Sequence, residues 1–214
     1  MENKILNITN GDAFNDYFIK NFSGEALPFR EVMMDGDTVG DVYSEDFIRV
    51  RASSLNVTPE VYRANAVVFD ALKNNEYSDL CLYFGKDTFC QMNLITLLAF
   101  LEQIEFAGRV FLNYIDDETF EIVQGNIAVN LGLYEHIYKM ILLEKRMPKD
   151  VKVLDLGAIE KYFDYHSDDG KLASIVRENS DKDDMAIICT LIECSKEYGI
   201  SDIQAKKLVE KYKS

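Results

Sequence analysis

The stretch Leu80-Cys81-Leu82-Tyr83-Phe84-Gly85-Lys86-Asp87 runs from a continuous apolar segment into a glycine and an aspartate, and a long helical pattern follows from Phe89 to Glu105. The same arrangement occurs near the start of the chain. There Lys4-Ile5-Leu6-Asn7-Ile8 leads through Thr9-Asn10-Gly11-Asp12 into the amphipathic segment Phe14 to Phe22. Each copy predicts a buried strand, a tight turn and a helix. In an open parallel sheet such turns gather at the carboxyl edge, where ligands bind.

Two further segments read as strands, Glu25 to Phe29 and Arg109 to Ile115, and residues 44–55 and 58–72 read as helices. Thr58 followed by Pro59 is typical of a helix N-terminus. Apolar strands separated by helices indicate a parallel sheet with helices on both faces. We therefore predict an α/β fold with a Rossmann-like, mainly parallel sheet flanked by helices. We expect this domain to span residues 1–125 and a small helical C-terminal unit to span residues 126–214.

The composition is that of an ordinary globular protein, with 214 residues, 48% hydrophobic and 28% charged. The net charge of −14 weakens long-range attraction to nucleic acids and to anionic membranes. No segment of the sequence is apolar for long enough to span a bilayer, and no signal peptide is evident at the N-terminus. Four cysteines, at 81, 90, 189 and 194, match no zinc motif, so we expect reduced, buried thiols in a cytoplasmic protein.

Several segments together resemble a bacterial family catalogued as domain of unknown function 1835. They are Ile8 to Asp12, Pro28-Phe29-Arg30-Glu31 with Gly36-Asp37, Phe47 to Arg51, and Leu82 to Leu94. Tyr83 stands where that family commonly has tryptophan. The resemblance covers roughly residues 4–115 and implies the domain and the residues at its edge, without implying an activity.

Candidate ligand contacts follow the predicted strands. Asp12 and Asp87 each precede a helix, where an aspartate either caps free N–H groups only or also contacts a ligand. Gln91 lies one turn after Asp87, and Arg30 and Glu31 follow the second strand. The predicted ligand-binding residues are Asn10, Gly11, Asp12, Arg30, Glu31, Asp37, Arg49, Gly85, Asp87 and Gln91.

Other chemistry is less well supported by the sequence. The chain lacks a Gly-x-Gly-x-x-Gly and a Walker A motif, so no cofactor is identified and the standard dinucleotide and triphosphate sites are absent. Asp116, Asp117 and Glu118 would have to join Asp12 and Asp87 to form a hard-cation site; a solvated acidic turn is the favoured interpretation, and no metal is predicted. Cys90 lies in the first turn of a helix, where a thiolate is stabilised, but a buried structural cysteine is favoured.

We therefore expect a protein that binds a small polar or nucleotide-like ligand at the carboxyl edge of its sheet, with catalysis left open. The alternative is a regulatory protein whose segment from Leu191 to Tyr212 resembles a helix-turn-helix and contacts DNA or a protein partner. Its last helix is locally basic, with lysines at 206, 207, 211 and 213. The overall acidity and the absence of arginine from this helix weigh against DNA.

Overall fold

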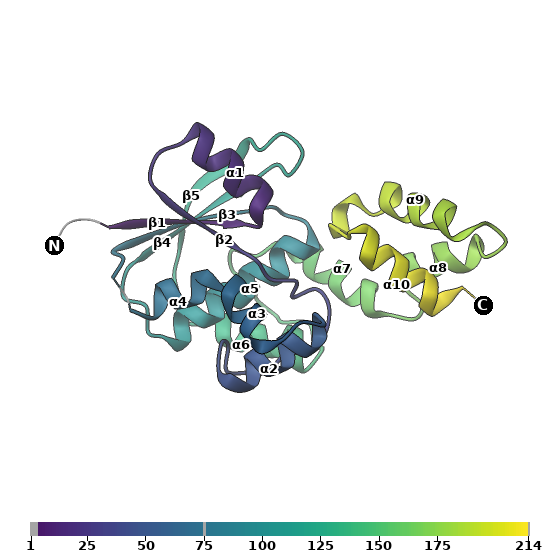
Figure 1. The fold of residues 1–214 in the computed structure, drawn as a ribbon, viewed down its shortest axis with the longest axis horizontal. Helices are drawn as coiled ribbons and strands as arrows, with labels where there is room; N and C mark the ends of the chain where they lie inside the picture. The colour runs from purple at the N-terminus through teal and green to yellow at the C-terminus, as the bar shows by residue number, and fades with distance from the viewer. Residues whose placement is uncertain (1–3, 75, 214) are drawn as a thin grey trace.

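The computed structural model describes residues 4–74 and 76–213, and a five-stranded sheet forms its centre (Figure 1). The strands are β1 (Ile5–Asn10), β2 (Glu25–Phe29), β3 (Asp79–Phe84), β4 (Arg109–Ile115) and β5 (Ile122–Val129). Their order is β2-β1-β3-β4-β5; the first four strands are parallel and β5 is antiparallel to β4. The predicted α/β fold with a mainly parallel sheet is confirmed.

Helices cover both faces of this sheet. The helices of the chain are α1 (Asp12–Asn21), α2 (Glu45–Ser54), α3 (Pro59–Asn65), α4 (Val67–Lys73), α5 (Thr88–Gln103), α6 (Tyr134–Tyr138), α7 (Leu156–His166), α8 (Lys171–Glu178), α9 (Asp184–Cys194) and α10 (Asp202–Tyr212), of which the last three do not lie on the sheet. A π-helical turn, η1 (Lys139–Leu143), continues α6, and a 3₁₀ turn, η2 (Lys196–Tyr198), follows α9. Helix α1 lies on one face of the sheet, and α4 and α5 lie on the other (Figure 1).

Helix α5 forms the centre of the hydrophobic core. Its leucines at 94, 97, 98 and 101 are fully buried, as the predicted apolar stripe requires. The remaining residues from 88 to 101 are also buried, apart from the half-buried Phe89. The reason is that α5 packs against β3 on one side and against α6 and α7 on the others. A helix covered on all sides in this way is apolar around most of its circumference.

The single helix expected over residues 58–72 is wrong, because the chain forms α3 and α4 with a break at Ala66. Ala66 has φ −85° and ψ 37°, outside the helical region. The break lets α3 pack on α2 while α4 turns to pack on β2. The predicted start is confirmed: the Thr58 hydroxyl accepts a hydrogen bond from the Val61 N–H, and Pro59 begins the helix.

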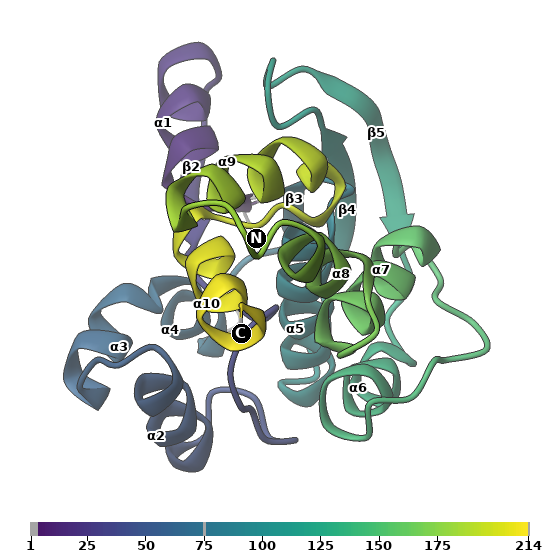
Figure 2. The same cartoon turned by 90° about the vertical axis from the view of Figure 1, so that its right-hand side faces the viewer.

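The expected boundary at residue 125 falls inside strand β5. Beyond that strand, α6 and α7 pack directly on α5, so they belong to the layer that covers the sheet. Only α8, α9 and α10 form an appended unit, in which each helix contacts the other two. This unit lies across the carboxyl ends of the parallel strands (Figure 2). None of the helices in the described part of the chain is both long and apolar enough to cross a membrane.

Candidate ligand site at the carboxyl edge

The order of the strands places a topological switch point between β1 and β3. Strand β1 pairs with β2 on one side and with β3 on the other, both in parallel. The crossover through α1 lies on one face of the sheet, and the crossover that ends in α4 lies on the opposite face (Figure 1). In open α/β sheets the crevice at the carboxyl end of such a switch point is where ligands bind.

Asn10 is the last residue of β1 and links the end of this strand to helix α5. Its Nδ2 atom donates a hydrogen bond to Cys90 Sγ at 2.8 Å, and its Oδ1 atom accepts one from Asn93 Nδ2 at 2.9 Å. The side chain of Asn10 is therefore fixed across the switch point.

Asp87 begins α5 as its N-cap, as the sequence predicts. Its Oδ1 atom accepts a hydrogen bond from the Cys90 N–H at 3.0 Å. The second carboxylate oxygen, Oδ2, is buried and has no hydrogen-bond partner among the described residues. Capping therefore accounts for only one of the two oxygens. A buried acceptor of this kind needs a donor, which a bound group or a protonated neighbouring acid supplies.

Asp117 follows β4 and brings a second carboxylate to the same place. The residue is exposed overall, but its carboxylate faces the buried groups around Gly85, with Oδ1 at 3.9 Å from Cys90 Sγ. Burial of this carboxylate, reinforced by the negative charge of Asp87, raises the pKa of Asp117 to about 8. The sequence alone favours a solvated acidic turn for Asp117 and its neighbours, so the role of Asp117 is not predicted from it.

The neighbours of Asp117 do form such a turn. Asp116 Oδ1 accepts hydrogen bonds from the N–H groups of Glu118 and Thr119, and Glu118 forms an exposed ion pair with Lys196. Position in the sequence does not distinguish Asp117 from Asp116, because both follow β4, the neighbour of the strand that precedes Asp87. The side chains differ in direction: Asp116 bonds within the turn and Asp117 lies against Gly85.

Gly85 is the residue that allows the two carboxylates to come together. A Cβ atom at this position would lie 2.2 Å from Asp117 Oδ2 and 2.7 Å from Asp87 Oδ2. Such contacts are far too short for a real side chain, so any larger residue would displace at least one carboxylate. A glycine in this turn therefore allows the two carboxylates to lie close to the backbone at the site.

Cys90 lies beneath the two carboxylates and is 5% exposed. Burial, together with the charges of Asp87 and Asp117, raises the pKa of the thiol well above its ordinary value. In the metal-free chain the thiol is therefore protonated and is a poor nucleophile. All four cysteines are free; the expectation of buried thiols is wrong for Cys189 and Cys194, which are exposed.

Gly11, Asp12 and Arg30 lie at the ends of β1 and β2. Gly11 is the N-cap of α1 with φ 80°, and its N–H donates to the Phe29 carbonyl at 3.1 Å. Asp12 is therefore in the first turn of the helix, and the expectation that it caps the helix is wrong. Its carboxylate instead forms an ion pair with Arg30 at 2.8 Å, in which both side chains remain partly exposed.

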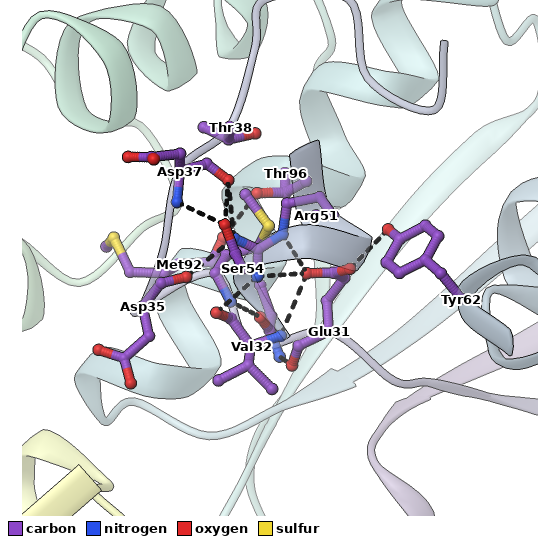
Figure 3. Close-up of polar contacts among 12 residues, drawn as sticks. Glu31, Val32, Asp35, Asp37, Thr38, Arg51, Ser54, Tyr62, Met92 and Thr96 are labelled. Atoms are coloured by element: carbon purple, nitrogen blue, oxygen red, sulfur yellow. Dashed lines mark hydrogen bonds and ion pairs between the residues drawn. The ribbon is translucent and has the colours of Figure 1, made fainter. Parts of the chain in front are cut away.

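Glu31 is not available to a ligand, contrary to the sequence prediction. It is 3% exposed and forms a buried ion pair with Arg51, which is itself fully buried (Figure 3). The Tyr62 hydroxyl donates to the other carboxylate oxygen at 2.5 Å. The guanidinium also donates to three backbone carbonyls, those of residues 32, 35 and 37. This network fixes the loop between β2 and α2.

Three other predicted contacts lie away from the switch point or are enclosed. In the loop just described, the Asp37 N–H donates a hydrogen bond to the Ser54 hydroxyl, and the Asp37 carbonyl accepts one from Arg51. Arg49 is 71% exposed and pairs with Asp46 on the surface of α2. Gln91 is fully buried; its Nε2 donates to the Gly85 carbonyl at 2.7 Å and its Oε1 accepts from the Asp155 N–H at 2.9 Å. The Gln91 amide therefore holds the Gly85 turn through these two hydrogen bonds, and it is not available to a ligand.

The C-terminal unit covers the site from outside. A Cβ atom at Gly199 would lie 2.2 Å from Asp87 Oδ1 and 3.1 Å from Phe89 Cβ, so the turn between η2 and α10 rests on the start of α5. The backbone of Gly199 adopts the left-handed conformation, with φ 67°, that the tight turn requires. Sequence reasoning identified this turn only as part of a helix-turn-helix.

The basic residues of α10 are neutralised within the chain. Lys207 lies 3.6 Å from an Asp35 oxygen, Lys211 pairs with Asp168 at 3.0 Å, and Lys206 lies 3.9 Å from Glu210. These pairs leave α10 without the unopposed positive face that binding to phosphates requires. They support the interpretation of this segment as a packed helical hairpin.

Comparison with known proteins identified no matching family model, no matching curated protein and no matching solved structure. The resemblance to domain of unknown function 1835 therefore stays a prediction.

Proposed function

We propose that this protein binds a small polar ligand at the carboxyl edge of its sheet, between the strand ends and the C-terminal unit. The observation that carries the proposal is the convergence of Asn10, Asp87 and Asp117, from the ends of three adjacent parallel strands, on the switch point of the sheet. This is the position at which doubly wound folds bind their ligands. The remaining predicted contacts at this edge are Gly11, Asp12, Arg30 and Gly85.

The charge of the site indicates the chemistry of the ligand. Two carboxylates meet at Gly85, and neither forms an ion pair with a cation of the described residues. They favour a ligand that presents hydroxyl or amino groups, such as a sugar or a nucleoside. Arg30, with 35% of its side chain exposed, lies at the neighbouring strand end and supplies a cationic group for a phosphate on a nucleotide-like ligand.

A thermal-shift screen over sugars, nucleosides and nucleotides tests the proposal. A compound present at about 100 times its Kd stabilises the folded state by about 2.7 kcal/mol, which raises the melting temperature measurably. We expect Asp87→Asn to abolish this rise, because asparagine still caps a helix but lacks the charge. The matched control is Asp46→Asn, an exposed aspartate of α2, which should keep the full response.

Two results would contradict the proposal. One is a screen in which no compound of these classes raises the melting temperature of the wild-type protein. The other is a stabilising compound whose effect is the same in Asp87→Asn as in Asp46→Asn.

A further inference from the structure

Three donor atoms of different side chains meet at the switch point. One ligand atom each from Asp87, Cys90 and Asp117 lies within 4.8 Å of the others. A single ion placed among them would be within reach of all three after small side-chain adjustments, since metal–oxygen and metal–sulfur bonds are about 2.0–2.3 Å long.

Two acidic side chains face each other at this site, and no cation of the described residues forms an ion pair with either. The buried Asp87 Oδ2 receives no hydrogen bond from an N–H group of the described residues and faces the Asp117 carboxyl, and no ion pair to Asp87 or Asp117 occurs among residues 4–74 and 76–213. The nearby Lys86 ammonium lies over the Tyr114 ring, 4.8 Å from its centroid. Two neighbouring carboxylates in a buried site repel each other, and a bound cation is one of the groups that compensates them.

The surroundings of Cys90 favour a sulfur ligand. Asn10 Nδ2 donates a hydrogen bond to Sγ, and Asn10 is itself held by Asn93. Such a donor stabilises a metal-bound thiolate and orients the sulfur, as outer-sphere partners do in metal sites. Thiolate combined with carboxylate suits zinc and related transition metals, whereas Mg²⁺ and Ca²⁺ prefer oxygen donors only.

We propose that Asp87, Cys90 and Asp117 bind one divalent transition-metal ion of the zinc class. Binding releases the proton of the Cys90 thiol to solvent, and the thiolate forms the metal–sulfur bond. Three protein ligands leave a fourth position for water or for a group of the bound molecule. The inference rests on the ligand site proposed above, because it uses the same two carboxylates.

The test uses Co²⁺ as a spectroscopic substitute for Zn²⁺ on the full-length protein after treatment with EDTA. We expect a sulfur-to-cobalt charge-transfer band that saturates at one ion per chain and is displaced by Zn²⁺. Cys90→Ser should lose this band. Asp87→Asn should weaken Zn²⁺ binding by at least about 100-fold, because it removes a direct ligand and the loss of an outer-sphere partner alone costs up to about that much.

The exposed cysteines provide the matched control. The double variant Cys189→Ser/Cys194→Ser should keep the band and its stoichiometry, because both residues are exposed on α9 and neither belongs to the group of donor atoms. The proposal is overturned if the wild-type protein gives no band, if the band survives in Cys90→Ser, or if the double variant loses it. Asp87→Asn retains its helix cap, so it reports on metal binding even if Cys90→Ser fails to fold.

The metal proposal and the ligand proposal fail separately. A small molecule that stabilises the wild-type protein in EDTA, but not Asp87→Asn, would keep the ligand site and remove the metal. Metal binding by a protein that no small molecule stabilises would keep the metal site and remove the ligand site.

Discussion

Arg51→Met should lower the free energy of unfolding by about 3–5 kcal/mol, because it leaves the Glu31 carboxylate buried without its cationic partner. The loss also frees three backbone carbonyls that the guanidinium satisfies (Figure 3). Urea unfolding, with the midpoint and the slope analysed separately, measures the change.

The matched control is Arg49→Met on the same helix. Arg49 is 71% exposed and its pair with Asp46 is fully solvated, so this variant should change stability by no more than about 0.5 kcal/mol. The double variant Glu31→Gln/Arg51→Met should regain part of the loss by removing the unpaired charge. Equal effects of Arg51→Met and Arg49→Met would show that the buried network does not stabilise this loop.

The stability of the metal-free chain should fall as the pH rises towards about 8, and Asp117 is the source. Its pKa is about 8 in the folded protein and near the ordinary 3.8 when unfolded. Between these values the folded state binds more protons than the unfolded state, so the free energy of unfolding decreases with pH. The contribution is fully present below the unfolded pKa and is lost as the pH passes through the folded pKa.

Asp117→Asn removes this dependence, because asparagine resembles the protonated carboxyl. Measured in EDTA from about pH 5 to about pH 9, the variant should gain stability relative to wild type as the pH rises. Glu118→Gln, at an exposed neighbouring ion pair, should differ from wild type by a constant amount over the same range. A constant difference for Asp117→Asn as well would mean that its carboxylate titrates normally and does not meet Asp87.

The layers of the fold could be predicted because their signals are local. Continuous apolar strands followed by glycine and an acid indicate a parallel sheet without any knowledge of the partners. Strand β5 gave no such signal: it is an exposed edge strand, interrupted by Gly125 and by Asn126 at φ 57°. Its pairing with β4 stabilises it, and that pairing is not visible in its own residues.

The sequence could not predict which of the candidate residues face a ligand and which only stabilise the fold, because this depends on contacts between residues that are far apart in the sequence. Glu31 and Arg51 are 20 residues apart and meet only because the loop after β2 folds against α2. Gln91 faces Asp155, 64 positions away. Residue types at a strand end identify an edge of the sheet, but burial decides which of them face outward.

Asp87 shows the opposite case, in which the sequence identified the residue and left its role open. Capping was expected and is confirmed at Oδ1. The second oxygen is buried and faces the Asp117 carboxyl, and this contact distinguishes the residue from an ordinary cap. Its neighbour Asp117 was accessible to the same reasoning, since both follow adjacent strands of the sheet.

The most direct test of the ligand site is an amide ¹H–¹⁵N NMR titration with the compound that gives the largest thermal stabilisation. The account predicts that the shifted signals concentrate at residues 10–12, 85–90 and 117, around the switch point. The contradicting result is a set of shifts confined to a separate cavity of about 450 Å³ lined by Leu133, Ile137, Met140 and Pro148, with the strand ends unchanged.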